Sequence, residues 1–163
     1  MKFVKATVCL SVLLALGACS EKETAESHLS KAKTYSKENK TNAAVIELKN
    51  AIRADVKSGE ARFLLGQSYL NQGNGVDAVK ELERAKELKY TNEKLLPLLA
   101  RAYILTDSDY DIIALTEAAK SLTKAASSQF LAYKALAALR SEQTELAKES
   151  IKLAKEAEPE GLY

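Results

Sequence analysis

The chain has 163 residues, of which 47% are hydrophobic and 28% are charged, and its formal net charge is +2. Because acidic and basic side chains nearly cancel, the chain has no strong overall field for binding nucleic acid. Lysine, glutamate, alanine and leucine dominate and there are only two prolines. This composition favours an all-helical protein over a β-rich one.

The first residues have the features of an export signal. Lys2 and Lys5 make a basic start, and residues 6–16 form an uncharged and mostly apolar stretch. At about 11 residues this stretch is too short for a permanent transmembrane helix, which needs about 20, but it suits the apolar core of a signal peptide. Residues 16–19 then read Leu-Gly-Ala-Cys, which resembles the lipobox of bacterial lipoproteins.

This resemblance implies that residues 1–18 are removed and that Cys19 carries lipid, with residues 19–24 as a tether. Attachment to a membrane would then be stable, because several acyl chains are buried together. Ser20 in place of an aspartate resembles the signal for sorting to the outer membrane, on its periplasmic side, although the inner membrane remains an alternative. An ordinary secretory signal with an incidental cysteine is the other interpretation. Without residues 1–18 the chain has 22 basic and 22 acidic residues.

From residue 25 onward, side chains recur with one fixed period. The period is shared by three tyrosines and by the small residues that precede each of them by three positions, namely Tyr35, Tyr69, Tyr103, Ala32, Gly66 and Ala100. Such a period indicates one helix pair repeated along the chain. We predict four pairs, at residues 25–58, 59–92, 93–127 and 128–161. Because a pair cannot bury its apolar face alone, the pairs should stack into a superhelix.

The second pair shows the pattern most clearly. Residues 62–69 read Arg-Phe-Leu-Leu-Gly-Gln-Ser-Tyr, and Ala78 and Leu82 follow. This resembles the tetratricopeptide repeat, whose pattern is W-x2-L-G-x2-Y followed by A-x3-F and a proline. The small residues Gly66 and Ala78 should allow its two helices to approach closely, and Gly73 should end the first helix in a left-handed conformation.

The last two predicted pairs depart from the pattern. In the third pair, Ile112 stands where a small residue is expected and Thr116 where an aromatic one is expected. We therefore predict that its second helix is shortened or displaced. The fourth pair is offset by one residue, which a one-residue slip in the third pair would explain.

A closer family resemblance rests on the lipobox, on residues 47–52, which read Glu-Leu-Lys-Asn-Ala-Ile, and on the run from residue 60 to residue 102. Together they are similar to the start of the tetratricopeptide-repeat lipoproteins of the PEP-CTERM system. Those proteins accompany the exosortase and exopolysaccharide loci of Gram-negative bacteria. Members of that family are several times longer, with many more repeats. The alternative is a repeat lipoprotein of pilus or outer-membrane assembly.

Catalytic chemistry has little support in the sequence. His28 is the only histidine, and it has no cysteine partner once Cys19 carries lipid, so a structural or solvated histidine is the preferred interpretation. The chain has no glycine-rich phosphate loop. We expect no enzyme activity, no cofactor and no metal site.

Asp107, Asp109 and Asp111 alternate like the opening of a calcium loop. However, Ile112 stands in place of the required glycine and Ala118 in place of the closing glutamate. A turn between helices, with an aspartate as the N-cap of the second helix, is therefore the better interpretation.

In tetratricopeptide repeats the first helix of each pair lines a groove that binds partners. The positions that the repeat alignment assigns to this groove are Leu29, Lys33, Lys37, Phe63, Gln67, Leu70, Asn71, Pro97, Arg101, Ile104, Leu136 and Arg140. Its lysines and arginines would make a mildly basic lining that orients a partner, with Phe63 as an apolar anchor. The alternative is a solvated face whose cations are paired with glutamates.

These observations predict a membrane-anchored scaffold without catalytic activity. Its groove would recruit an extended or helical peptide from an envelope assembly system. A module that holds an exported polysaccharide is the second hypothesis, and it is less favoured because the chain has no tryptophan for stacking on sugars. A hydrolase is a distant third.

Overall fold

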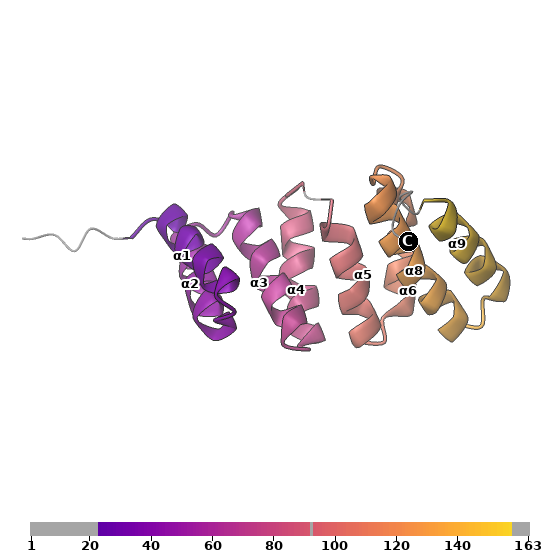
Figure 1. Ribbon diagram of the computed structural model, residues 1–163, viewed down its shortest axis with the longest axis horizontal. Coiled ribbons are helices and arrows are strands. Elements are labelled where there is room, and N and C mark those ends of the chain that lie inside the picture. The colour runs from indigo at the N-terminus through magenta and orange to yellow at the C-terminus, as the bar shows by residue number, and fades with distance from the viewer. Residues whose placement is uncertain (1–22, 92, 158–163) are drawn as a thin grey trace, which may run out of the picture.

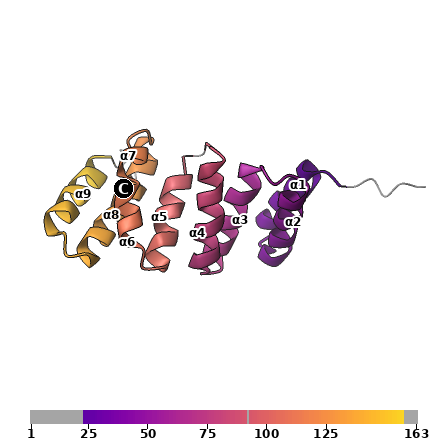
Figure 2. The ribbon, with the colours of Figure 1, turned by 180° about the vertical axis from the view of Figure 1, so that it is seen from behind.

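The computed structural model describes residues 23–91 and 93–157, which form nine helices and no strand. The predicted signal peptide and Cys19 lie outside the described residues. The helices are α1 (Ala25–Lys37), α2 (Thr41–Ala54), α3 (Gly59–Asn71), α4 (Gly75–Glu87), α5 (Leu95–Leu105), α6 (Asp109–Ala114), α7 (Thr116–Ala119), α8 (Lys124–Arg140) and α9 (Thr144–Glu156). Consecutive helices pack as hairpins, α1 on α2, α3 on α4 and α8 on α9. The hairpins follow one another in a row (Figures 1 and 2), so the predicted all-α arrangement of helical hairpins is confirmed.

The turn between the two helices of each hairpin has a backbone conformation that repeats along the chain. One residue of each turn has a positive φ angle: Asn39 (58°), Gly73 (73°), Asp107 (55°) and Glu142 (58°). The first three are evenly spaced and the fourth comes one position late, so the one-residue offset predicted for the fourth pair is present. The residue after each of them donates its N–H to the carbonyl five positions earlier, as Asn74 does to Tyr69 (2.9 Å). This is the bond that closes a helix with a left-handed cap.

The buried core runs from the first hairpin to the first helix of the last one. It begins at Leu29 in α1 and reaches Phe130 and Ala137 in α8. Gly66 lies against α4, where an added Cβ atom would clash with Leu82. The close approach predicted for the second hairpin is therefore confirmed. Each hairpin also packs on the next, α2 on α3 and α4 on α5, as expected where no pair buries its apolar face alone.

The third repeat differs from the others in its second helix. In place of one long helix the chain forms α6, of six residues, and α7, of four. Thr116 donates its hydroxyl to the carbonyl of Ile113 (2.7 Å) at the break, and such side-chain bonds compete with helix continuation. The predicted shortening is confirmed.

Two boundary predictions in this region are wrong. Helix α8 begins at Lys124 rather than at 128, because the hydroxyl of Thr123 accepts a bond from Ala126 N and caps the helix there. The N-cap of α6 is Ser108 rather than an aspartate, and its side chain makes no capping bond. Asp107 instead takes the left-handed turn position, which aspartate tolerates better than most side chains.

None of the helices in the described ranges combines the length and the apolar character that crossing a membrane requires.

Candidate functional site

Four of the residues predicted to line the groove are buried in the core. They are Leu29, Phe63, Leu70 and Pro97. Phe63 is only 4% exposed, and its ring lies 5.4 Å from the ring of Tyr90, centroid to centroid. Tyr90 follows the end of α4 and so holds α3 and α4 together. Phe63 therefore contributes to packing in this structure and has little surface to offer a partner as an anchor.

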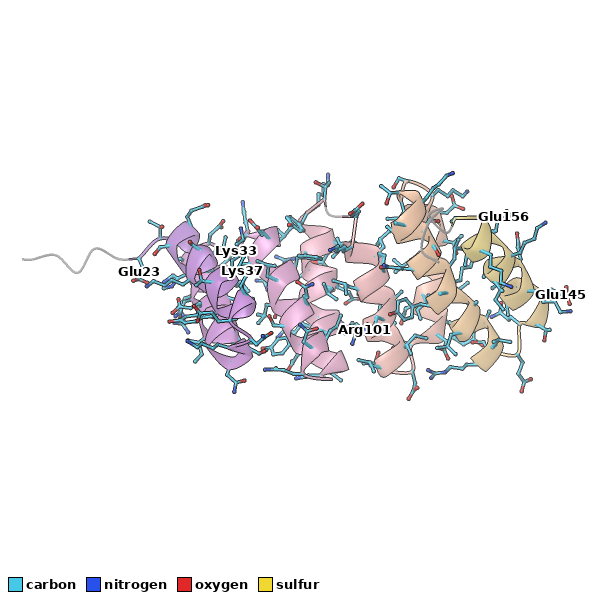
Figure 3. All side chains as sticks on the ribbon, viewed as in Figure 1. Glu23, Lys33, Lys37, Arg101, Glu145 and Glu156 are labelled. Carbon is cyan, nitrogen blue, oxygen red and sulfur yellow. The ribbon has the colours of Figure 1, made fainter. Side chains whose placement is uncertain are left out.

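The other predicted groove residues keep surface that a partner can reach. Lys33, Lys37, Asn71, Leu136 and Arg140 are exposed, and Gln67, Arg101 and Ile104 are partly exposed. Lys33 and Lys37 lie on α1 and Arg101 on α5, where Figure 3 labels them. We call this surface of α1, α3, α5 and α8 the first-helix face.

Two cations of the first-helix face are already paired. Lys33 Nζ lies 2.8 Å from Oε1 of Glu60, which links α1 to α3, and this hydrogen bond raises the pKa of Lys33. Arg140 pairs with Asp107 and with Asp109 Oδ2, at 3.1 Å for the latter. Both cations thus connect neighbouring helices.

Lys37 and Arg101, by contrast, have no ion-pair partner within the described ranges. The predicted basic lining therefore divides into two paired cations and two that remain available to a ligand. The alternative interpretation, a face of paired cations, describes Lys33 and Arg140 only.

Two exposed leucines on helices of this face were not among the predicted groove residues. Leu105 (49% exposed) and Leu139 (55% exposed) join the predicted Leu136 (42% exposed). Arg140 Nη1 donates to the carbonyl of Ile104 (3.2 Å), so the last turns of α5 and α8 lie side by side. The repeat offered a signal for Leu105, which stands one full period after the predicted Asn71. We call Leu105, Leu136 and Leu139 the apolar end.

A second group of polar side chains connects the two helices of a hairpin. His28 Nδ1 lies 2.6 Å from Glu47 Oε2 in the first hairpin, and Arg62 Nη1 lies 2.7 Å from Glu81 Oε2 in the second. The two pairs have the same sequence separation, and the second stands one full period after the first. They therefore occupy one repeat position. The side chain of His28 is 15% exposed, and its partner is a carboxylate.

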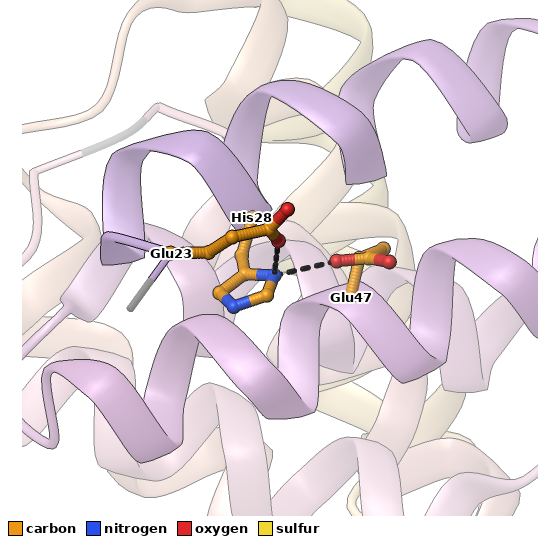
Figure 4. Close-up of side chains that lie close together, drawn as sticks. All are labelled: Glu23, His28 and Glu47. Atoms are coloured by element: carbon orange, nitrogen blue, oxygen red, sulfur yellow. Dashed lines mark hydrogen bonds and ion pairs between the residues drawn. The ribbon is translucent and has the colours of Figure 1, made fainter. Parts of the chain in front are cut away.

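The first hairpin adds a carboxylate to this arrangement. Glu23 Oε2 lies 3.3 Å from the same nitrogen of His28 (Figure 4). Its other oxygen pairs with Lys31, and this hydrogen bond lowers the pKa of Glu23. Asn50 and Arg53 border a hollow of about 380 Å³ beside Glu23 and His28.

A third contact repeats between neighbouring hairpins. Lys49 Nζ lies 5.8 Å from the centre of the Tyr69 ring, between α2 and α3. The hydroxyl of Tyr103 donates to Glu83 Oε1 (2.6 Å), between α4 and α5. Burial raises the pKa of Tyr103, and the hydrogen bond to Glu83 raises it further. Two of the tyrosines that define the period are therefore residues that join one hairpin to the next.

Comparison with known proteins yields no matching family and no similar curated protein.

Proposed function

We propose that this chain is a non-catalytic scaffold of the tetratricopeptide type that binds protein segments on its first-helix face. Contacts between equivalent residues recur from one hairpin to the next. The left-handed turn residues of the first three repeats, the polar pair at residues 28 and 47, and the tyrosine contacts all return with the same period. A row of hairpins built in this way presents one continuous surface, which is how repeat proteins bind their partners.

The partner that this surface favours is an acidic peptide segment with apolar side chains. Lys37 and Arg101 supply positive charge without ion-pair partners in the described ranges, and charged groups of this kind set orientation and association rate. The apolar end supplies exposed leucines, and burial of apolar area supplies affinity at about 25 cal/mol per Å².

We further propose that the scaffold works in a Gram-negative cell envelope. Support comes from the lipobox at residues 16–19 and from the resemblance to repeat lipoproteins of the PEP-CTERM system. Cys19 would hold the array on a membrane, and its face would recruit a component of exopolysaccharide or exosortase assembly. The outer membrane, on the periplasmic side, is the proposed location.

Site-specific photocrosslinking tests the proposed face. A photoreactive phenylalanine analogue placed at Leu136 should crosslink to an envelope protein in living cells. The same analogue at Val76, which is 72% exposed on α4, is the matched control and should not crosslink to that protein. Crosslinking at both positions alike, or at Val76 only, would contradict the proposal.

Charge reversal tests whether the two unpaired cations are needed for this crosslink. Lys37→Glu with Arg101→Glu should abolish the crosslink from position 136, because both cations would face the ligand and neither is held in an ion pair. Lys80→Glu with Lys86→Glu changes the same number of charges at exposed positions of α4 and should leave the crosslink intact. Lys33→Glu is avoided, because it would place a second carboxylate beside Glu60.

A further inference from the structure

We propose that Glu23, His28 and Glu47 form a zinc site that joins the segment before α1 to helix α2. Figure 4 shows the three side chains converging on one point, from the segment before α1, from α1 and from α2. One oxygen of each glutamate and Nδ1 of the histidine lie within 4.8 Å of one another. Imidazole nitrogen and carboxylate oxygen are both ordinary zinc ligands.

One distance within the cluster already suits a tetrahedral metal, and a second needs a small shift. Ligand bonds of about 2.0–2.2 Å place neighbouring donor atoms about 3.3 Å apart. The distance from His28 Nδ1 to Glu23 Oε2 is already 3.3 Å, whereas Glu47 Oε2 is closer, at 2.6 Å. Zinc would replace the proton shared between Nδ1 and Glu47, and this glutamate would move back by about 0.7 Å to reach the same ligand geometry. The hollow beside Glu23 and His28 leaves room for a water as the fourth ligand.

The first hairpin has one more carboxylate at these positions than the second hairpin. There Arg62 and Glu81 form the equivalent pair, and the residue one full period after Glu23 is Lys57. The second hairpin thus pairs one carboxylate with one permanent cation. The first hairpin turns two carboxylates toward a single imidazole, and Lys31 offsets the charge of only one of them, so a divalent cation has a negative charge left to neutralise.

The charged groups around the cluster are compatible with a metal. Lys31 binds Oε1 of Glu23 and leaves Oε2 directed at His28. Arg53, the other nearby cation, donates to Asn50 Oδ1 (3.1 Å) and so has a partner of its own. His28 and Glu47 are largely shielded from solvent, with 15% and 18% of their side chains exposed, whereas Glu23 is more open.

Such a site would hold the start of the array rigid. Glu23 follows Cys19 closely in the sequence, so zinc would tie the tether to the first hairpin. This consequence depends on the proposed lipid anchor, whereas the zinc site itself does not.

The test is titration of the full chain with zinc, followed by calorimetry. Cys9→Ser and Cys19→Ser are introduced first, so that no thiol can bind the metal, and the protein is treated with a chelator and dialysed. We expect one zinc per chain and a higher unfolding temperature as zinc is added, because a ligand that binds only the folded state stabilises it. Glu23→Gln should weaken zinc binding by at least about tenfold, since loss of an outer partner alone already costs that much.

Glu81→Gln is the matched control. It removes the equivalent carboxylate of the second hairpin and should leave zinc affinity unchanged. Glu23 lies outside any helix and is exposed, so Glu23→Gln should retain wild-type helicity by circular dichroism. Absence of saturable zinc binding would overturn the proposal and leave an ion-pair cluster only. Equal zinc affinity in Glu23→Gln and Glu81→Gln would overturn it as well, because the metal would then lie elsewhere.

Discussion

Gly66 in α3 lies directly against Leu82 in α4. A Cβ atom added at Gly66 would stand 2.6 Å from Cγ and 2.9 Å from Cδ2 of Leu82, and 3.3 Å from the carbonyl oxygen of Ala78. The first two distances are shorter than any ordinary carbon contact, so the Leu82 side chain would have to shift to admit a side chain at position 66. Hydrophobic packing at this contact sets how closely the second hairpin closes.

Gly66→Leu should therefore destabilise the protein. Overpacking of a filled core typically costs about 1–3 kcal/mol, and loss of one interface in a short array weakens both neighbours. Urea unfolding followed by circular dichroism measures the change. Ala132→Leu, at an exposed position of α8, is the control and should change the midpoint little. A wild-type urea midpoint for Gly66→Leu would show that α4 can move away from α3 without loss of stability.

The Arg62–Glu81 pair should be costly to break on one side only. Both side chains are largely buried, and Arg62 Nε has no hydrogen-bond partner within the described residues. Glu81→Leu alone leaves the guanidinium unpaired and should cost about 1–3 kcal/mol of unfolding free energy.

The double variant Arg62→Leu with Glu81→Leu should recover much of this loss, since replacing a buried ion pair by apolar residues is often neutral or stabilising. The third repeat supports the expectation, because Leu96 and Leu115 occupy the same positions there and both are buried. Additive losses in the double variant, measured by the same unfolding experiment, would mean that the two charges do not act as a pair.

Stability should fall in alkaline solution because of Tyr103. Its pKa is raised in the folded state by burial and by Glu83, whereas an unfolded tyrosine has a pKa of about 10. At pH values well below 10 the phenol is protonated in both the folded and the unfolded state. The contribution of Tyr103 to the free energy of unfolding is then fully present. Above that range the unfolded chain loses the proton first, which favours unfolding.

Unfolding free energies at pH 9 and pH 11 test this expectation. The wild type should lose more stability between the two than Tyr103→Phe, which has no phenol to titrate at this position. Tyr110→Phe, at a position that is 73% exposed, is the control and should behave as the wild type does. An equal decline in all three proteins would assign the alkaline loss to other groups.

Cys19→Ala should abolish incorporation of radiolabelled palmitate and leave an uncleaved or soluble protein. The reason is the Leu-Gly-Ala-Cys run at residues 16–19, whose thiol would carry the lipid. Cys9→Ala is the matched control, because Cys9 would leave with the signal peptide and labelling should persist. Palmitate on the Cys19→Ala protein would contradict the lipobox assignment.

The sequence alone determined the period and the local conformation of the repeats. Tyr35, Tyr69 and Tyr103 define the spacing, and the sequence predicted the left-handed turn at Gly73, which the structure repeats at Asn39 and Asp107. The face and the ends of a helix depend on residues only a few positions apart, so the pattern of residues along the chain predicts them. The same reasoning predicted the shortened second helix of the third repeat, whose residues depart from the pattern.

Only the tertiary structure decided which side chains are covered and which charges meet. Phe63 is buried because Tyr90, from the turn after α4, packs on it, and Lys33 is paired because α3 brings Glu60 beside α1. The cluster around His28 likewise joins a tether and two helices. Such contacts depend on how neighbouring helices cross and on side-chain reach across the interface. A repeat alignment assigns a position to a face, but the packing of the adjacent helix determines whether that face stays open to a partner.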